Sequence, residues 1–352
     1  MFFFWSKRHV VGPLELLRPE DGEDTAPLQR IVDGAEEADP AAPSPGQPAS
    51  SPAGTDFSRP KPVMFAWKPL SCGVGRIRYS LYLSRNEDFS DPMVYSGISQ
   101  PHMAVRNLYV GTRYYWKVRA EGRRIEPVES AVWSFRTHPA LPRWVFVPGI
   151  TNMRDLGGWP TTGGGQVRQG LVYRSSAMSS RRMRGETERI LLDELHIRTD
   201  LDLRSKDERP HPVLDEDRVR WQHAPVPPYG EFATEAGKNR YLNALRVFAD
   251  PDAYPILCHC RAGADRVGTV VFLLLGLLGV GFDDLARDYE LTSFSVWGKR
   301  SRHSAAFQAI AAALQMYPGD TINEQIENYA IAIGLVPAEI DRIRRILLEP
   351  KG

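Results

Sequence analysis

The 352-residue chain has few cysteines, little net charge and no long apolar run, and each of these absences excludes a class of protein. It contains three cysteines, too few and too irregularly spaced for a disulfide framework or for a metal site of the CxxC kind. Its formal net charge is +1, and it has no basic stripe with interleaved aromatic residues. We therefore expect no nucleic-acid partner, no bound metal and a reducing compartment.

Long apolar runs are also missing. The longest, from Val270 to Val280, is shorter than the roughly 20 residues that a membrane-spanning helix needs. A buried core helix explains it better. The N-terminal stretch MFFFWSKRHVVG has its apolar residues before its basic ones, the reverse of a secretory signal. We therefore expect a cytoplasmic protein without a transmembrane segment.

The first part of the chain predicts a small β-domain. Residues 34–60 are rich in Pro, Ala, Ser and Gly and lack hydrophobic periodicity, which predicts a disordered linker or insertion. Apolar and polar residues then alternate, as in residues 77–83, and this pattern is typical of strands in a β-sandwich.

The run LYVGTRYYWKVRA, residues 108–120, resembles strand F of fibronectin type III domains, with Tyr114 in the tyrosine-corner position. WSFRT, residues 133–137, would form the last strand, and Leu14–Leu17 the first. We assign residues 1–138 to a fibronectin type III-like domain, which makes the linker an insertion within it.

From about residue 139 to 352 the pattern becomes that of an α/β domain. Short apolar runs at 198–203 and 255–258 read as buried strands. They alternate with helical periodicity at 180–195, 237–249, 266–279, 283–294, 302–316, 320–333 and 337–348. Strands that alternate with helices predict a mostly parallel central sheet flanked by helices.

The segment PILCHCRAGADRVGTVV places chemistry between a strand and a helix. A tight loop in that position directs backbone N–H groups and the helix dipole at an anion, and the same field activates a cysteine thiolate. Cys260 is therefore the predicted nucleophile, and Arg266 offers a planar fork for two oxygens of a phosphate. Gly263 would relieve steric crowding where the loop turns. Cys72 and Arg78 have the same spacing but precede a strand-like pattern, so we interpret Cys72 as a decoy.

These residues match the protein tyrosine phosphatase signature HCxxGxxR. Upstream and downstream, NMRDLGG (152–158), LVYRSS (171–176), DLRSKDE (202–208) and DYELTS (288–293) resemble the bacterial atypical tyrosine phosphatase family, which includes secreted mycobacterial and listerial phosphatases of broad specificity. The resemblance implies a cysteine-phosphatase fold and metal-free hydrolysis of phosphotyrosine in proteins through a phosphocysteine. It leaves phosphoserine, phosphothreonine and phosphoinositides open as further substrates.

The resemblance also suggests roles for individual residues. Asp265 is the candidate general acid, with Asp202 and Asp155 as alternatives. Arg204 and Glu208 read as a structural pair. The predicted substrate-binding residues are His259, Arg261, Ala262, Gly263, Ala264, Arg154, Asp155 and Asp202. For His259 an orienting role competes with that of a buried core histidine, and Arg154 and Asp155 could support the loop or line the pocket.

Two positions depart from the family pattern. Ala264 replaces a lysine, which removes a positive charge from the pocket rim and argues against phosphoinositides. Val267 replaces a threonine and cannot donate a hydrogen bond to the nucleophile. Three alternatives stay open: a phosphoinositide phosphatase, a weakly active phosphoprotein-binding module and a rhodanese-like sulfurtransferase. The clamp arginine and the upstream motifs argue against the sulfurtransferase. The sequence does not predict the oligomeric state.

Overall fold

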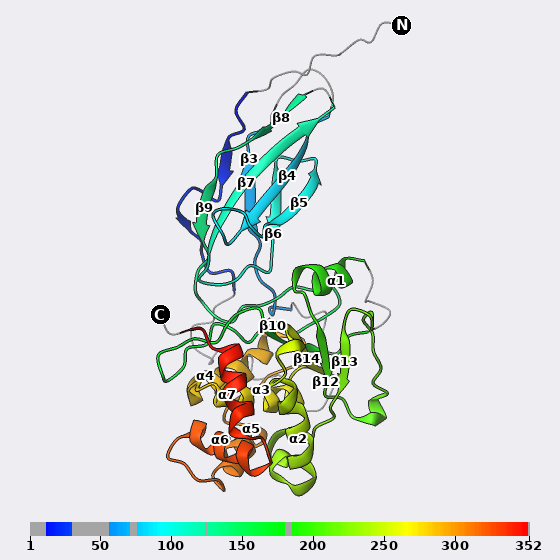
Figure 1. The fold of residues 1–352 in the computed structure, drawn as a ribbon, viewed down its shortest axis with the longest axis vertical. Coiled ribbons are helices and arrows are strands. Elements are labelled where there is room, and N and C mark those ends of the chain that lie inside the picture. Colours follow the sequence, from blue (N-terminus) through cyan, green and yellow to red (C-terminus); the bar gives the residue numbers. More distant parts are fainter. Residues whose placement is uncertain (1–11, 30–55, 71–75, 124, 180–184, 351–352) are drawn as a thin grey trace, which may run out of the picture. The chain divides into compact units, whose positions relative to one another are not determined.

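The computed structural model describes residues 12–29, 56–70, 76–123, 125–179 and 185–350 (Figure 1). Most of the predicted linker, Cys72 and the start of the predicted helix at 180–195 lie outside these residues. The described chain forms two compact units. The first holds residues 12–29 and 60–140, and the second holds residues 56–59 and 141–350.

The first unit is a β-sandwich, as predicted. One sheet has the order β1–β3–β6, and the other has the order β2–β9–β7–β4–β5, with β8 also paired to β7. The strands are β1 (Leu16–Arg18), β2 (Glu23–Asp24), β3 (Val63–Trp67), β4 (Arg78–Ser84), β5 (Met93–Ile98), β6 (His102–Val105), β7 (Arg113–Gly122), β8 (Ile125–Glu129) and β9 (Trp133–Arg136).

Local contacts support the fibronectin type III likeness. The hydroxyl of Tyr114 accepts a hydrogen bond from the backbone N–H of Tyr109 at 2.9 Å, which is the geometry of a tyrosine corner. Phe65 and Trp116 are completely buried and meet edge to face with ring centroids 5.0 Å apart. Such aromatic pairs between two inner sheet faces supply much of the burial that a small sandwich needs.

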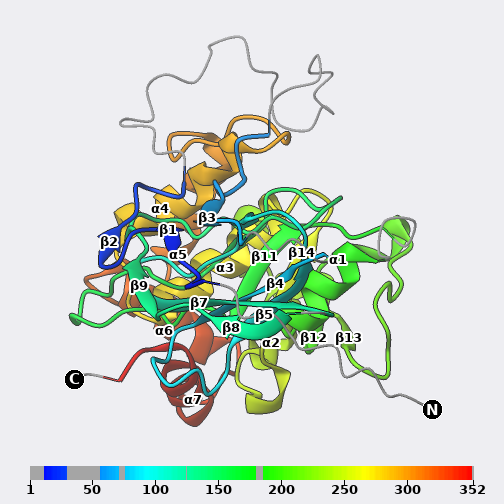
Figure 2. The same cartoon turned by 90° about the horizontal axis from the view of Figure 1, so that it is seen from above.

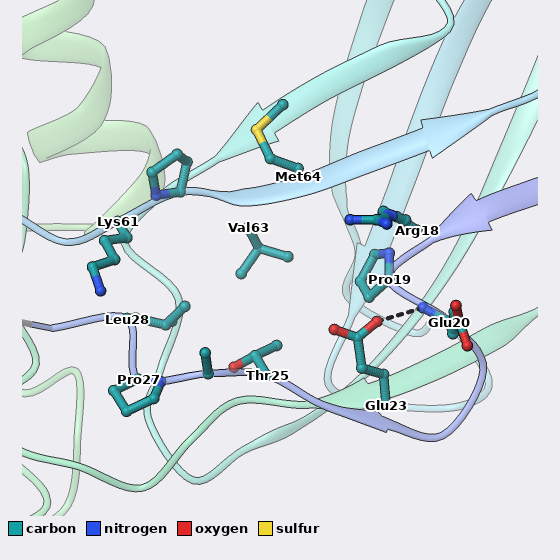
Figure 3. Close-up of a pocket in the computed structure, with 12 residues that line it drawn as sticks. Arg18, Pro19, Glu20, Glu23, Thr25, Pro27, Leu28, Lys61, Val63 and Met64 are labelled. Carbon is teal, nitrogen blue, oxygen red and sulfur yellow. Dashed lines mark hydrogen bonds between the residues drawn. The ribbon is translucent and has the colours of Figure 1, made fainter.

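A hollow of about 500 Å³ lies in the first unit between the β1–β2 turn and the start of β3 (Figure 3). Its walls combine prolines, aliphatic side chains and charges of both signs, including Arg18, Glu23 and Lys61. Neither cysteine nor histidine is among the residues that line it. The predicted catalytic residues all belong to the second unit.

The second unit has a five-stranded sheet of order β10–β11–β14–β12–β13. Strands β11, β14, β12 and β13 run parallel, and β10 is antiparallel to β11, so the mostly parallel sheet is confirmed. The strands are β10 (Arg154–Asp155), β11 (Val172–Ser176), β12 (Thr199–Asp202), β13 (Arg220–His223) and β14 (Ile256–Cys260).

The helices follow the predicted order closely. They are α1 (Glu186–Arg189), α2 (Glu235–Val247), α3 (Asp265–Leu277), α4 (Phe282–Glu290), α5 (Ala305–Leu314), α6 (Ile322–Ala332) and α7 (Pro337–Leu347), and α1 continues as a π-helical turn over residues 190–194 (Figure 2). Pro337 is the first residue of α7, as the sequence predicts, because its missing N–H would have no partner there.

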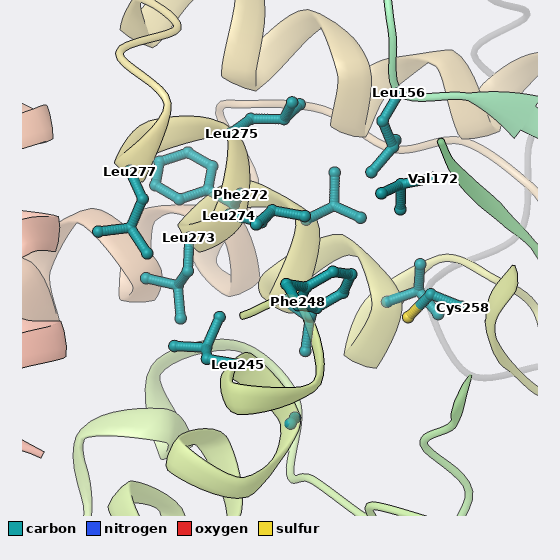
Figure 4. Close-up of a cluster of buried hydrophobic side chains, with 14 of the residues drawn as sticks. Leu156, Val172, Leu245, Phe248, Cys258, Phe272, Leu273, Leu274, Leu275 and Leu277 are labelled. Carbon is teal, nitrogen blue, oxygen red and sulfur yellow. The ribbon is translucent and has the colours of Figure 1, made fainter. Parts of the chain in front are cut away.

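Helix α3 is the centre of the second unit. Every residue from Val267 to Leu277 is buried, so the longest apolar run is a core helix, as predicted. Figure 4 shows Leu273 and Leu274 of α3 beside Leu245 and Phe248 at the end of α2. Among the described residues, no helix combines the length and the apolar character needed to cross a membrane.

Candidate active site

Cys260 is the last residue of β14, and α3 begins at Asp265. Strand β14 lies between β11 and β12, so the residues that follow it emerge at the carboxyl edge of the parallel sheet. Ligands of α/β proteins bind at this edge, and helix N-termini attract anions. The connecting residues 261–264 therefore lie where the sequence predicts an anion-binding loop, with Cys260, which is 2% exposed, at its start.

Gly263 has to be glycine for two reasons. Its φ of +65° is in the left-handed region, and a Cβ there would lie 2.3 Å from the carbonyl oxygen of Ser175. That oxygen belongs to the backbone of β11 and cannot move aside. The predicted steric role of Gly263 is thus confirmed by the loop geometry.

Two buried side chains bind the loop from behind. The Nδ2 group of Asn152 donates to the carbonyl oxygens of Ala262 and Gly263, both at 3.1 Å. Arg174 on β11 donates through Nη2 to the Gly263 oxygen at 2.6 Å. The C=O and N–H of a peptide unit point in opposite directions, so these bonds turn the following N–H groups toward an incoming anion.

A buried ion cluster holds these two side chains. Asp288 on α4 pairs with Arg174 and, at 2.9 Å, with Nε of Arg154 on β10, and all three side chains are at most 2% exposed. Arg154 Nη1 also donates to Asn152 Oδ1 at 2.6 Å. Burial opposes ionisation of Asp288, but the two arginines outweigh it and lower its pKa. Burial, with Arg174 nearby, lowers the pKa of Arg154 to about 10, which leaves it charged near neutral pH.

The cluster assigns physical roles to motifs that the sequence only matched by resemblance. Asn152 and Arg154 come from NMRDLGG, Arg174 from LVYRSS and Asp288 from DYELTS. Sequence reasoning missed Asn152, Arg174 and Asp288 as individual residues. Arg154 is fully buried and binds Asn152 and Asp288, contacts that favour the loop-supporting role over a place in the pocket lining.

Arg266, in the first turn of α3, is held by a carboxylate. Its Nη2 donates to Oε1 of Glu208 at 3.0 Å, and its Nη1 donates to Oε2. Hydrogen bonding to Arg266 lowers the pKa of Glu208 to about 2. Burial works against the charge of Arg266, but Glu208 and the nearby Cys260 raise its pKa overall. The bidentate pair fixes the plane of the guanidinium.

Similarity to known proteins covers the part of the chain that holds this site. The profile described as the tyrosine phosphatase family matches residues 145–349, more than half of the chain. The chain belongs to the tyrosine phosphatase family.

Two relatives carry phosphatase names. A Cupriavidus necator protein named as a candidate tyrosine-protein phosphatase is 34% identical over 169 residues, which are 40% of this chain and 59% of that protein. The triple specificity protein phosphatase PtpB of Mycobacterium tuberculosis is 38% identical over 80 residues, covering 23% of this chain and 29% of that one. The chain thus spans less than two thirds of the length of either relative.

Solved structures align with each unit. The core catalytic domain of the PP-IP phosphatase SIW14 from S. cerevisiae aligns with a TM-score of 0.32 and 18% identity, over 49% of this chain and 94% of that one. An Fn3-like protein from Clostridium thermocellum aligns with a TM-score of 0.19 and 19% identity, over 23% of this chain and 81% of that one. The fold assignment rests on the strand order described above.

In this member of the tyrosine phosphatase family, the predicted pair of Arg204 and Glu208 is wrong. Glu208 binds Arg266 instead, and Arg204 binds Asp202 through Nε at 2.9 Å and Nη2 at 2.7 Å. The spacing of Arg204 and Glu208 in the sequence therefore did not predict which arginine each carboxylate binds. Glu208 is instead the partner of the predicted phosphate-binding arginine.

Asp202 and Asp155, the two alternative acids, both accept hydrogen bonds from other groups of the protein. Asp202 is fully buried, and burial is outweighed by the bonds from Arg204, so its pKa is lowered. Asp155 accepts from Arg143 at 2.6 Å and from the backbone N–H groups of Gly157 and Gly170 at 2.8 and 2.6 Å. Both carboxylates are thus buried and hydrogen-bonded to groups of the protein.

His259 lies on β14 with its ring turned toward acidic residues of β12. Its Nε2 is 2.8 Å from Oδ1 of Asp200, and its Nδ1 is 3.9 Å from Oδ1 of Asp202. Burial favours the neutral ring, but the two carboxylates outweigh it and raise the pKa of His259. This environment supports an orienting role. Of the other loop residues, Ala264 is completely buried and Arg261 is exposed.

Asp265 is more accessible than the other two acids, with 35% of its side chain exposed. Its Oδ1 accepts from the hydroxyl of Tyr229 and from Nε of Arg300, the latter at 3.1 Å. Burial and the Asp265 charge raise the pKa of Tyr229, so Tyr229 stays protonated and donates. Sequence reasoning missed Tyr229 and Arg300, and nothing local in the sequence signals either.

The position after the clamp arginine is buried and apolar. Val267 is completely buried in the first turn of α3. Thr269, two residues further along α3, does carry a hydroxyl, but this hydroxyl accepts from the Tyr229 N–H at 2.9 Å and donates to the Asp265 carbonyl at 3.0 Å. Its proton is therefore already used within the helix.

Proposed function

We propose that this chain hydrolyses phosphotyrosine in proteins through a phosphocysteine formed on Cys260. The observation that carries the proposal is the loop from Cys260 to Arg266. It begins at a nucleophilic thiol, has its carbonyl oxygens bound from behind, and ends at an arginine whose plane is fixed by Glu208. This arrangement suits a tetrahedral dianion next to a thiolate.

The first step transfers the phosphoryl group to the enzyme. The Cys260 thiolate attacks phosphorus, the bond from phosphorus to the tyrosyl oxygen breaks, and its electron pair goes to that oxygen. The oxygen takes a proton from Asp265, and the free tyrosine side chain leaves. The N–H groups of the loop and Arg266 bind the three other phosphate oxygens throughout.

The second step restores the enzyme. Water attacks phosphorus and passes a proton to the Asp265 carboxylate. The bond between phosphorus and sulfur breaks, and its electrons return to Cys260 as a thiolate. The product is inorganic phosphate, and neither step needs a metal ion.

The ion pair between Asp265 and Arg300 bears on this mechanism. The Arg300 guanidinium binds Oδ1 at 3.1 Å and so fixes the direction of the carboxyl group that has to deliver a proton in the first step. Both donors that reach Asp265 from the described residues bind Oδ1, so Oδ2 is the oxygen that would carry and deliver the proton.

Protein phosphotyrosine is the substrate class we favour over phosphoinositides. With alanine at position 264, the basic side chains of the loop are Arg261 and Arg266, and Arg266 is already paired with Glu208. A polyphosphorylated headgroup would need further cations around the pocket. We also propose a cytoplasmic, reducing location, because the two described cysteines are free thiols and the mechanism requires Cys260 to stay reduced.

Hydrolysis of p-nitrophenyl phosphate and of phosphotyrosine peptides by the purified protein tests the proposal. Cys260→Ser should abolish turnover yet still bind orthovanadate, because the loop amides and Arg266 remain. Cys72→Ser is the matched control and should leave kcat unchanged. Loss of activity with EDTA, or equal behaviour of the two variants, would rule out the thiolate mechanism.

A further inference from the structure

Four residues that precede the sandwich strand β3 belong to the second unit. The described residues Asp56–Arg59 group with residues 141–350, whereas the residues on either side of them in the described chain, 12–29 and 60–140, form the first unit. The Phe57 N–H donates to the carbonyl oxygen of Phe294 at 2.9 Å. The Arg59 guanidinium lies 5.1 Å from the centroid of the Phe146 ring. We call Asp56–Arg59 the strap.

The strap is held in its own turn by Asp56. Oδ1 of Asp56 accepts from the backbone N–H of Ser58 at 3.0 Å and from the Ser58 hydroxyl, and Oδ2 accepts from Nε of Arg59 at 3.1 Å. The Asp56 side chain is only 7% exposed. A carboxylate that caps its own turn in this way fixes the direction of the serine hydroxyl.

Ser58 contacts the residue that supports the loop. Its Oγ accepts a hydrogen bond from the backbone N–H of Asn152 at 3.3 Å, and Ser58 is 2% exposed. Asn152 has a φ of +54° and is completely buried. A buried N–H needs an acceptor, and the strap supplies it. The side chain of the same Asn152 binds the carbonyl oxygens of Ala262 and Gly263.

We propose that Ser58 is a positioning residue of the active site, acting through the backbone of Asn152 on the anion-binding loop. The strap then contributes to the active site of the second unit, although in the chain it lies between the sandwich strands β2 and β3. Asp56 contributes by orienting Ser58. The proposal rests on the proposed function only in that the loop binds phosphate, and the loop geometry can be measured without turnover.

Hydrogen exchange of the full chain gives that independent measurement. Ser58→Ala removes the acceptor of the Asn152 amide, and we expect roughly tenfold faster exchange there and a smaller acceleration in residues 261–265. Binding of inorganic phosphate should weaken severalfold, seen as a higher inhibition constant and KM with a smaller change in kcat. Asp56→Ala should act in the same direction, and Ser58→Thr, which keeps the hydroxyl, should restore both readings.

Ile343→Val on α7 is the control, because it removes a buried methylene from the same unit without touching the strap. It should lower the melting temperature and leave exchange at Asn152 and phosphate affinity unchanged. If Ser58→Ala leaves both readings at wild-type values, or if Ile343→Val changes them equally, the positioning role is wrong. If exchange responds but the wild type neither binds phosphate nor hydrolyses aryl phosphates, the strap stands and the proposed function fails.

Discussion

Replacing Glu208 by glutamine tests whether a carboxylate holds the phosphate-binding arginine in place. The bond to Arg266 lowers the pKa of Glu208 from 4.5 to about 2. Taken at face value, that difference corresponds to at most about 3 kcal/mol of folding free energy. The two side chains are 18% and 26% exposed, and solvent screening reduces the contribution to about 1 kcal/mol.

The sign of the pH dependence follows from the lowered pKa. The stabilisation is fully present above pH 4.5, where Glu208 is ionised in both the folded and the unfolded chain, and it is lost as the pH falls toward 2. Glu208→Gln should therefore lower the free energy of unfolding by about 1 kcal/mol at pH 7, with a difference from wild type that shrinks between pH 4.5 and 3. Urea unfolding at pH 7, 5, 4 and 3 measures this.

The same variant should weaken phosphate binding about tenfold, because a neutral amide cannot accept both guanidinium donors. Asp250→Asn is the matched control. It breaks another arginine–carboxylate pair, Arg220 with Asp250 at 2.8 Å, on an exposed part of the unit. That variant should leave phosphate affinity unchanged. A Glu208→Gln protein with wild-type phosphate affinity, or with a stability loss that does not depend on pH, would refute the reasoning.

Two further predictions concern the first residues of α3. Asp265→Asn should slow aryl phosphates with poor leaving groups far more than those with good ones, by up to about 10²–10⁴-fold, and a uniform loss would make Asp265 a loop-shaping residue. Because valine lacks a hydroxyl and Thr269 is already engaged, breakdown of the phosphocysteine should limit kcat and produce a burst near one equivalent of aryl alcohol. Val267→Thr would restore one hydrogen bond to the charged Cys260 sulfur, which contributes about 1.5–3 kcal/mol. The variant should therefore raise kcat roughly tenfold or more and shrink the burst. A linear time course that threonine leaves unchanged would contradict this.

The parts of the molecule that the sequence predicted well are those set by local patterns. Helical periodicity located α2 to α7 to within a few residues, and the alternation at 77–83 and around Tyr114 located the sandwich strands β4 and β7. The loop from Cys260 to Arg266 was also accessible, because strand, loop and helix are consecutive. In each case the physical cause lies within one stretch of chain.

Contacts between segments that are distant in the sequence could not be predicted in this way. Glu208 and Arg266 are 58 residues apart, and Asn152 and Ala262 are 110 apart. Which distant residues meet depends on the strand order, and spacing alone led to the wrong partner for Glu208. Strand β11 was also missed, because Arg174, Ser175 and Ser176 are buried polar residues that break the apolar pattern of a central strand.

The polar residues of β11 show why the pattern fails at this place. A central strand made only of apolar residues would pack well, but it would leave the loop carbonyls without donors. Arg174 supplies a donor and requires a buried counterion, which Asp288 provides together with Arg154. Burying such ions is costly, and an apolar replacement would often be at least as stable. The cluster of two arginines and one aspartate keeps a net positive charge directly behind the Cys260 loop, where the proposed function requires an anion to bind. The residues that obscure the strand in the sequence are therefore the ones that fix the loop for anion binding.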